Sequence, residues 1–278
     1  MRKTFCSFLK MFVSAGALLS ASSALAQTST DIRPPLTTPD GHDIYAGDDD
    51  DFEEDHLTIG VGGMYQPKYL GARGYEFQPI LALDWKSGNL FANFEDGLGV
   101  MAIDDDTFSV GAGIVPIFDG YDRKDVPNGF NKVDVGAGVR GFASVRQAGF
   151  EATAGVTQIF VGSTKGVLAD FSIAYDIEVN DRLFISPSVG VTWANAKHTN
   201  RFYGVSAQQS ADSGLPEFRP GAGFLDAEAQ VFLQYRLTDH LGLGVGGGVS
   251  TLLDNAKDSP IVSKRTAPTG TAFLTYTF

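Results

Sequence analysis

The chain has 278 residues, of which 33 are glycine and 30 are Phe or Tyr, and its formal net charge is −12. Such acidity argues against a general nucleic-acid partner, which would need a basic face. After residue 26 no apolar run reaches the length of about 18 residues that a transmembrane helix needs, so a helical membrane span is excluded there.

Residues 1–26 have the composition of a cleaved secretory signal peptide. Three basic residues lie within the first ten, residues 11–19 (MFVSAGALL) form a short apolar core, and the small residues that a signal peptidase reads end at Ala26. Cleavage after Ala26 removes three bases and no acid, so the net charge becomes −15. It also removes Cys6, the single cysteine, and leaves no disulfide and no thiolate metal ligand.

Residues 27–55 differ in composition from everything after them. Three prolines interrupt any regular element, and Asp48–Asp55 (DDDDFEED) holds acids at all but one position. Repulsion between these carboxylates predicts an extended, solvated tail on the periplasmic side of the membrane. A calcium site is the alternative, because oxygen ligands are plentiful, although the spacing of an EF-hand is absent.

From His56 onward the polarity of the side chains alternates with a period of two, which places successive side chains on opposite faces of a strand. Between Leu225 and Leu237 the odd positions are all apolar or aromatic, whereas the even positions include Asp226, Glu228 and Arg236. One face suits lipid and the other carries charges that lipid rejects. Such alternation predicts an all-β transmembrane antiparallel barrel over residues 56–278.

The links between these segments alternate between tight turns and long loops, as in membrane barrels, where the tight turns are periplasmic. The predicted strands number twelve: 56–65, 75–85, 89–94, 97–103, 107–118, 132–146, 150–161, 167–179, 183–195, 223–238, 241–252 and 269–278. An even count places both mature termini in the periplasm. The pair 89–94 and 97–103 is short for a full crossing, which leaves ten strands as the alternative.

The chain ends in aromatic or apolar residues at every second position, the last of them being Tyr276 and Phe278. This ending resembles the signal read by the barrel assembly machinery, and it predicts an outer-membrane location among lipid and lipopolysaccharide. Aromatic residues near strand ends are expected to form interfacial belts. The predicted outer belt is Tyr65, Tyr69, Tyr75 and Tyr121, and the predicted periplasmic belt is Trp85, Phe150, Tyr235 and Phe278.

Several loop motifs resemble the MipA/OmpV family of outer-membrane proteins. They are YGVS at 203–206, SGLP at 213–216 and LLDNAKDSPIV at 252–262, with MYQPKYLG at 64–71 near the start. The motif residues singled out are Gly204, Val205, Ser206, Ser213, Gly214, Leu215, Ser259 and Pro260. The resemblance implies a non-enzymatic scaffold that joins a murein hydrolase to a murein synthase. Other members of the family are described as antigens, adhesins or osmotic-stress proteins.

Charged residues of both signs fall on the predicted lumen face. They are Lys132, Asp134, Arg140, Arg146, Asp170, Asp176, Asp226, Glu228 and Arg236. Because an uncompensated buried charge costs several kcal/mol, we expect them to pair and to fill a narrow interior. If water does pass, the excess of acids favours cations, so a narrow cation-preferring channel is the second functional hypothesis.

A Ser–His hydrolase is the remaining alternative. His198 alone among the histidines falls near the longest predicted outer loop, and the polar residues near it in the sequence are Ser206, Ser210, Asp212 and Ser213. The Gly-x-Ser-x-Gly motif of a nucleophile elbow does not occur. We therefore expect a polar loop with no catalytic residues, no cofactor and no metal ion.

Overall fold

The computed structural model describes residues 55–278. The predicted signal peptide and all of the acidic tail except Asp55 lie outside the described residues. The strands are β1 (His56–Pro67), β2 (Tyr75–Ser87), β3 (Leu90–Asn93), β4 (Gly97–Asp104), β5 (Phe108–Ile117), β6 (Gly136–Gln147), β7 (Phe150–Val161), β8 (Val167–Tyr175), β9 (Ile177–Asn180), β10 (Leu183–Ala194), β11 (Gly223–Arg236), β12 (Leu241–Leu252) and β13 (Thr266–Thr277).

Short helical segments occur only in the links of the described chain. They are the 3-10 turns η2 (Arg123–Asp125) and η3 (Ala256–Asp258) and the α-helices α2 (Ala196–Tyr203) and α3 (Ala207–Ser213). Within residues 55–278, no helix combines the length and the apolar character needed to cross a bilayer.

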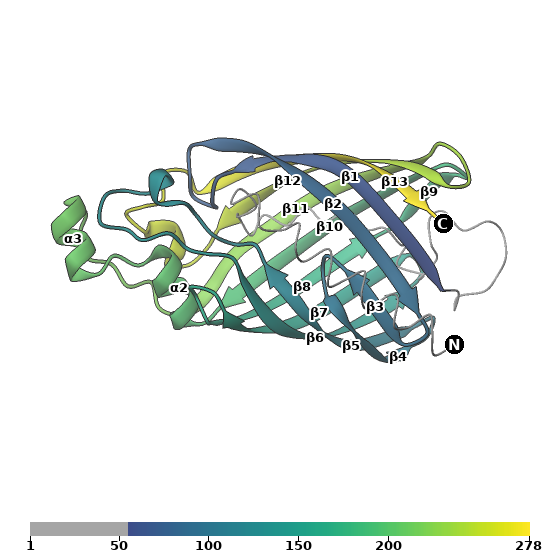
Figure 1. Cartoon of the computed structure of the whole chain (residues 1–278), viewed down its shortest axis with the longest axis horizontal. Coiled ribbons are helices and arrows are strands. Elements are labelled where there is room, and N and C mark those ends of the chain that lie inside the picture. The colour runs from purple at the N-terminus through teal and green to yellow at the C-terminus, as the bar shows by residue number, and fades with distance from the viewer. Residues whose placement is uncertain (1–54) are drawn as a thin grey trace, which may run out of the picture.

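The strands form one antiparallel sheet that closes on itself (Figure 1). β8 and β9 both pair with β10, one after the other along its length, so together they occupy a single position in the wall. β10 also pairs with β11, and β1 pairs with β13, which joins the first and last strands. The described chain is therefore a closed barrel of twelve wall positions. The predicted count is confirmed, and the ten-strand alternative is wrong.

The two faces of the wall have opposite polarity. Outward side chains are apolar and exposed, as at Phe77 (70% exposed) and Leu81 (67%), whereas inward positions include the buried Arg140 and Thr58. An exposed apolar band of this extent fits contact with acyl chains and not with water. The barrel is thus built to span a membrane.

Link lengths sort by end of the barrel. Apart from the β3–β4 turn at 94–96, the tight turns gather at one end, here called the turn end, and the long links 68–74, 118–135, 195–222 and 253–265 gather at the other, the loop end. Both described ends of the chain lie at the turn end, because Thr58 pairs with Thr277 and the Phe278 amide donates to the Leu57 carbonyl (3.1 Å). Figure 1 shows the C-terminus at the end of the barrel opposite α2 and α3.

Glycines on the lumen face of β12 make room for two aromatic rings. A Cβ at Gly244 would lie 2.5 Å from the ring of Phe273, and one at Gly246 would lie 2.6 Å from the ring of Phe232. The two rings stack with centroids 5.3 Å apart. The alternation of glycine with apolar residues in this strand therefore reflects a lumen face that must stay flat beneath these rings.

The hairpin of β3 and β4 does not extend along the full wall. β3 pairs with β2 only from Asp84 to Ser87, close to the turn end, and its turn at 94–96 leads back into β4. The two strands predicted as short are therefore genuine wall strands that stop part-way along β2. The predicted strand 167–179 is in turn interrupted at Asp176, between β8 and β9.

Candidate functional site: a cap at the loop end above a charged lumen

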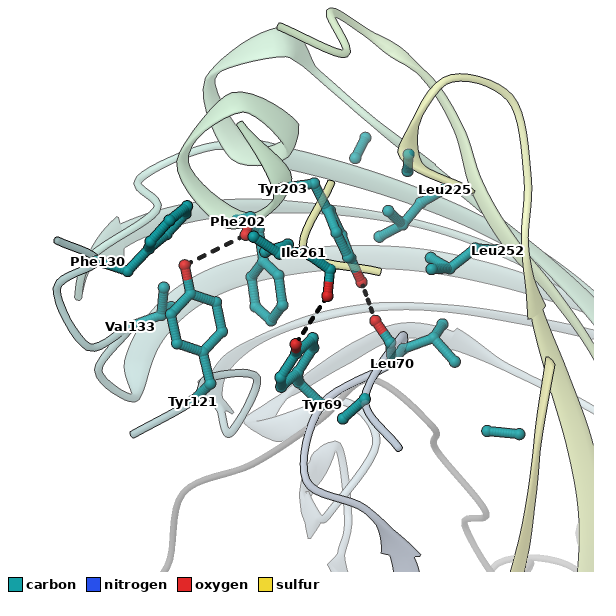
Figure 2. Close-up of a cluster of buried hydrophobic side chains, with 14 of the residues drawn as sticks. Tyr69, Leu70, Tyr121, Phe130, Val133, Phe202, Tyr203, Leu225, Leu252 and Ile261 are labelled. Carbon is teal, nitrogen blue, oxygen red and sulfur yellow. Dashed lines mark hydrogen bonds between the residues drawn. The ribbon is translucent and has the colours of Figure 1, made fainter. Parts of the chain in front are cut away.

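Buried apolar side chains from the long links pack together over the loop end of the barrel (Figure 2). We call this cluster the cap. Its largest members are Tyr69, Leu70, Tyr121, Phe130, Phe202, Tyr203, Val205, Leu225, Leu252 and Ile261. Each of them is at most 3% exposed. Because the members come from four links and from the ends of β11 and β12, the cap closes the loop end with a packed core.

Tyrosine hydroxyls tie the links of the cap to one another (Figure 2). The Tyr203 hydroxyl donates to the Leu70 carbonyl (3.1 Å), that of Tyr69 to the Ile261 carbonyl (3.0 Å), and that of Tyr121 to the Phe202 carbonyl (3.3 Å). Burial raises the pKa of Tyr69 to about 12 and that of Tyr203 well above its usual value. These hydroxyls are therefore neutral donors at any physiological pH.

The family motifs build this cap. A Cβ at Gly204 would lie 2.3 Å from the Asn200 carbonyl oxygen, so only glycine fits directly after α2. The next residue, Val205, forms an antiparallel bridge with Phe218, and the Ser259 hydroxyl donates to the Tyr203 carbonyl (2.5 Å). The motif residues thus hold separate links together.

The remaining motif residues except Pro260 lie around α3, at the edge of the cap. Ser206 begins α3 with a capping box, since its hydroxyl accepts from the Gln209 amide (3.3 Å) and its own amide donates to the Gln209 side chain (2.8 Å). Gly214 ends the helix in the left-handed conformation, with φ of +75°. Leu215 packs against the cap, and Pro260 follows Ser259 in the link before β13.

The predicted outer aromatic belt is wrong at two positions. Tyr69 and Tyr121 lie in the cap and not at a lipid interface, because the links that carry them fold inward over the mouth. Tyr65 and Tyr75 lie near the loop end of β1 and β2 and stack on each other with centroids 5.2 Å apart. At the turn end Phe150, Tyr235 and Phe278 are exposed, whereas Trp85 is partly buried.

Arg140 is the centre of the charged lumen. Its guanidinium is buried and forms a bidentate pair with Asp170 (2.5 and 2.9 Å) while its Nε donates to Asp96 (2.8 Å). A Cβ at Gly155 would lie 2.3 Å from Arg140 Nη1, so the glycine leaves the space that the guanidinium occupies. Asp96 was missed from the sequence because it lies in the β3–β4 turn, outside the period-two pattern.

Further ion pairs lie in the lumen toward the turn end. Arg146 approaches Glu151 (3.6 Å) and Asp104 (4.0 Å), and Lys86 pairs with Asp104 at 2.7 Å. Charges of both signs therefore pair across neighbouring strands, as a confined interior requires.

The other predicted lumen charges do not join one network. Lys132 and Asp134 pair with each other at 2.7 Å, but they lie in the link before β6 with their side chains 62% and 48% exposed. Their assignment to the lumen is corrected, because β6 begins only at Gly136.

The remaining charges are spread over the height of the barrel. Asp226 is buried beneath the cap and close to Glu228, at the loop end of β11. Asp176 lies in the break between β8 and β9, and Arg236 lies over the ring of Phe184 near the turn end, 5.9 Å from its centroid.

The histidine considered for hydrolysis is buried in the cap. His198 stacks on Phe202, with ring centroids 5.8 Å apart, and burial lowers its pKa to about 4. The hydroxyls of Ser210 and Ser213 donate to the carbonyls of Leu215 and Gln209. Within residues 55–278, these serines form no hydrogen bond with His198, whose Nδ1 has no hydrogen-bond partner. The geometry therefore supplies no activated nucleophile at this place.

A family model described as MltA-interacting protein MipA matches residues 59–278, which include every barrel strand except the first three residues of β1. The chain belongs to the MipA family. Its cap and its charged lumen are thus features of a MipA-family barrel.

Curated relatives of this MipA-family barrel carry two kinds of name. A protein of Pasteurella multocida named 24 kDa outer membrane protein is 26% identical over 221 residues, which cover 74% of this chain and 84% of the relative. The protein named MltA-interacting protein of Escherichia coli K12 is 27% identical over 116 residues, which cover 42% of this chain and 46% of the relative. Among solved structures, the NanC porin aligns with a TM-score of 0.44 and 11% identity over 78% of this chain and 98% of the porin.

Proposed function

We propose that this MipA-family barrel is a non-enzymatic interaction protein of the outer membrane that binds murein-remodelling enzymes on the periplasmic side. The observation that carries the proposal is the cap, because a barrel whose loop end is closed by a packed core is not organised as an open pore. The name of the Escherichia coli relative, MltA-interacting protein, supports a murein hydrolase as one partner. A murein synthase is the second proposed partner.

The turn end is the proposed docking face. Tight turns of membrane barrels face the periplasm, and the described chain begins there. Asp55 is held at this end, since its carboxylate accepts from the Gly88 amide (2.7 Å) and the Ser87 hydroxyl (2.8 Å), which lowers its pKa. The acidic segment 27–55 therefore joins the barrel beside the turns. In this arrangement both mature termini are periplasmic, and Tyr276 and Phe278 are available to the assembly machinery.

The charge of the turn end indicates the kind of surface that it fits. Exposed acids gather in its turns, namely Asp55, Asp105, Asp106, Asp181 and Asp239. Together with the other six acids of Asp48–Asp55 they favour a partner with a basic face, toward which electrostatic attraction speeds encounter.

Co-purification from crosslinked cell envelopes tests this proposal. We expect the full chain to capture a murein hydrolase and a murein synthase, and we expect deletion of residues 27–55 to reduce that capture. A control deletes residues at the opposite end, 206–214 of the α3 region, none of which is buried, and should leave the capture unchanged. If both deletion variants capture the murein enzymes equally, or if only the loop-end deletion reduces that capture, the turn end is not the docking face.

A narrow cation channel is the second candidate, and one observation favours it. Asp226 and Glu228 place two acids side by side in the lumen directly beneath the cap. If the cap opens, this acidic constriction favours cations. Planar bilayer recordings would then show discrete cation-selective conductance, reduced by Asp226→Asn with Glu228→Gln. If no conductance appears over a wide voltage range, the channel function is contradicted and only the interaction role remains.

A further inference from the structure

Besides the short break at Asp176, the described barrel wall contains a longer interval in which strand pairing stops. β1 pairs with β2 over its whole length from Tyr75 to Lys86, but on the other edge β3 lies only beside Asp84–Ser87. β4 in turn pairs with β5 only from Ser109 to Ile114. In the described part of the chain, no strand therefore lies between residues 75–83 of β2 and residues 115–117 of β5. We call this interval the β2–β5 seam; Figure 1 shows β3 and β4 as short arrows beside the longer β2.

Side-chain contacts lie along the borders of the seam. Phe94 of the β3–β4 turn contacts Phe118, which follows β5, with ring centroids 6.5 Å apart. At the loop end Lys68 pairs with Asp125 across the two links that border the seam. At the boundary of the seam nearer the turn end, Asp96 pairs with Arg140. The seam is thus bordered by two ion pairs and, on its β5 side, by the aromatic contact between the hairpin tip and Phe118.

Proline marks both edges of the seam. Pro79 lies in the middle of the free edge of β2, and Pro116 lies in the part of β5 that β4 does not reach. Proline has no amide hydrogen to donate, and within sheets it is found mainly on edge strands. A free edge in hydrocarbon is costly when its amides lack acceptors, so proline there lowers the number of donors that need one.

The seam adjoins apolar surface on both sides of the wall. Outward, Phe77 and Leu81 are the most exposed apolar side chains of β2. On the lumen side of the same strand, Ile80 and Ala82 pack against the stacked rings of Phe232 and Phe273. Apolar side chains therefore lie on both faces of the same short stretch of β2, exposed on the outer face and packed on the lumen face.

The lumen next to this apolar surface is charged, with an excess of acids. Arg140 is shared by Asp96 and Asp170, and Glu151 lies further along beside Arg146. A ligand that reached Phe232 from the seam would place a polar head among these groups. That head would be neutral or cationic, because an anion would meet more carboxylates than bases.

We propose that the β2–β5 seam is a lateral gate, through which an amphiphile with an apolar body and a neutral or cationic head exchanges between the outer leaflet and the lumen. Opening the seam separates side chains but breaks no ladder hydrogen bond, whereas opening the wall elsewhere exposes paired backbone to hydrocarbon. The cap closes the axial route at the loop end, so the gate is the route that remains. This exchange is an activity separate from the binding of murein enzymes.

Crosslinking across the seam tests the gate. The described chain contains no cysteine, so the pair Lys68→Cys with Asp125→Cys, which lie in contact from the two links that border the seam, can be bridged by a short bis-maleimide. The matched control is Val61→Cys with Leu81→Cys, which are directly opposite each other on the fully paired β1 and β2 and are both exposed outward. The readout is the uptake of crystal violet, a cationic amphiphile, by Gram-negative cells that express the full chain.

We expect the unmodified protein to raise dye uptake several-fold above the vector control. Bridging the seam should return uptake to the vector level, whereas bridging the control pair should leave it raised. Phe94→Ala with Phe118→Ala, which removes the aromatic contact without a crosslink, should raise uptake further. Uptake that does not exceed the vector level, or that survives the seam crosslink, would overturn the proposal. Equal loss with both crosslinks would overturn it as well.

Discussion

Removal of the Arg140 guanidinium is the most direct test of the charged lumen. Arg140→Gln leaves Asp96 and Asp170 without the cation that joins them, in an interior where the arginine is only 4% exposed. Breaking a buried ion pair from one side costs about 3–5 kcal/mol. The two aspartate side chains are 14% and 30% exposed, so water relieves part of this cost. We therefore expect a loss near the lower figure, about 3 kcal/mol.

Equilibrium unfolding in urea measures this loss when the protein is folded into phospholipid vesicles. Unfolding is followed by the fluorescence of the two tryptophans of the chain. Trp85 lies opposite Ala92 of β3, so its signal also reports on the β3–β4 hairpin, whose turn contains Asp96. The matched control is Arg265→Gln, which breaks the pair with Asp258 at 2.8 Å. That pair is mostly exposed, and its loss should change the free energy of unfolding by less than about 1 kcal/mol.

Double substitution separates the ion pair from packing. Arg140→Gln combined with Asp170→Asn removes one of the two carboxylates that Arg140→Gln leaves without a cation. The double variant should therefore recover part of the stability that Arg140→Gln alone loses. If Arg140→Gln were no more destabilising than Arg265→Gln, the buried pairs would contribute little to the fold. The reasoning on the lumen would then be refuted.

Three further predictions concern the cap, the lumen wall and assembly. Burial lowers the pKa of His198 to about 4 from 6.5, so the unfolded chain takes up the proton first, and stability should fall by up to about 3 kcal/mol as pH drops from 6.5 to 4. His198→Phe should abolish this dependence in the urea titration. Gly246→Val should cost about 1–3 kcal/mol by pressing on the Phe232 ring, whereas Gly247→Val, which meets only one atom at 3.8 Å, should be nearly neutral. Deletion of Phe278 should lower the amount of folded barrel in the membrane fraction, and an unchanged amount would remove its role in assembly.

The sequence alone predicted the features that depend on local pattern. Alternation with a period of two is a property of each strand by itself, so it predicted the strands, the outward apolar face and the even count. Link lengths are equally local, and they predicted which connections gather at each end. The same reasoning failed at Lys132 and Asp134, where the alternation begins a few residues before β6 does.

Only the tertiary structure decided what the links and turns do, because their contacts join residues far apart in the sequence. Tyr203 reaches Leu70 across the mouth of the barrel, and no pattern within either link predicts that approach. Arg140 meets Asp96 from a turn that carries no alternation. The seam has the same origin, since a short hairpin leaves a gap in a wall only once its longer neighbours have closed around it. Sequence periodicity determined the wall, and three-dimensional closure determined the cap, the ion pairs and the interval without strand pairing.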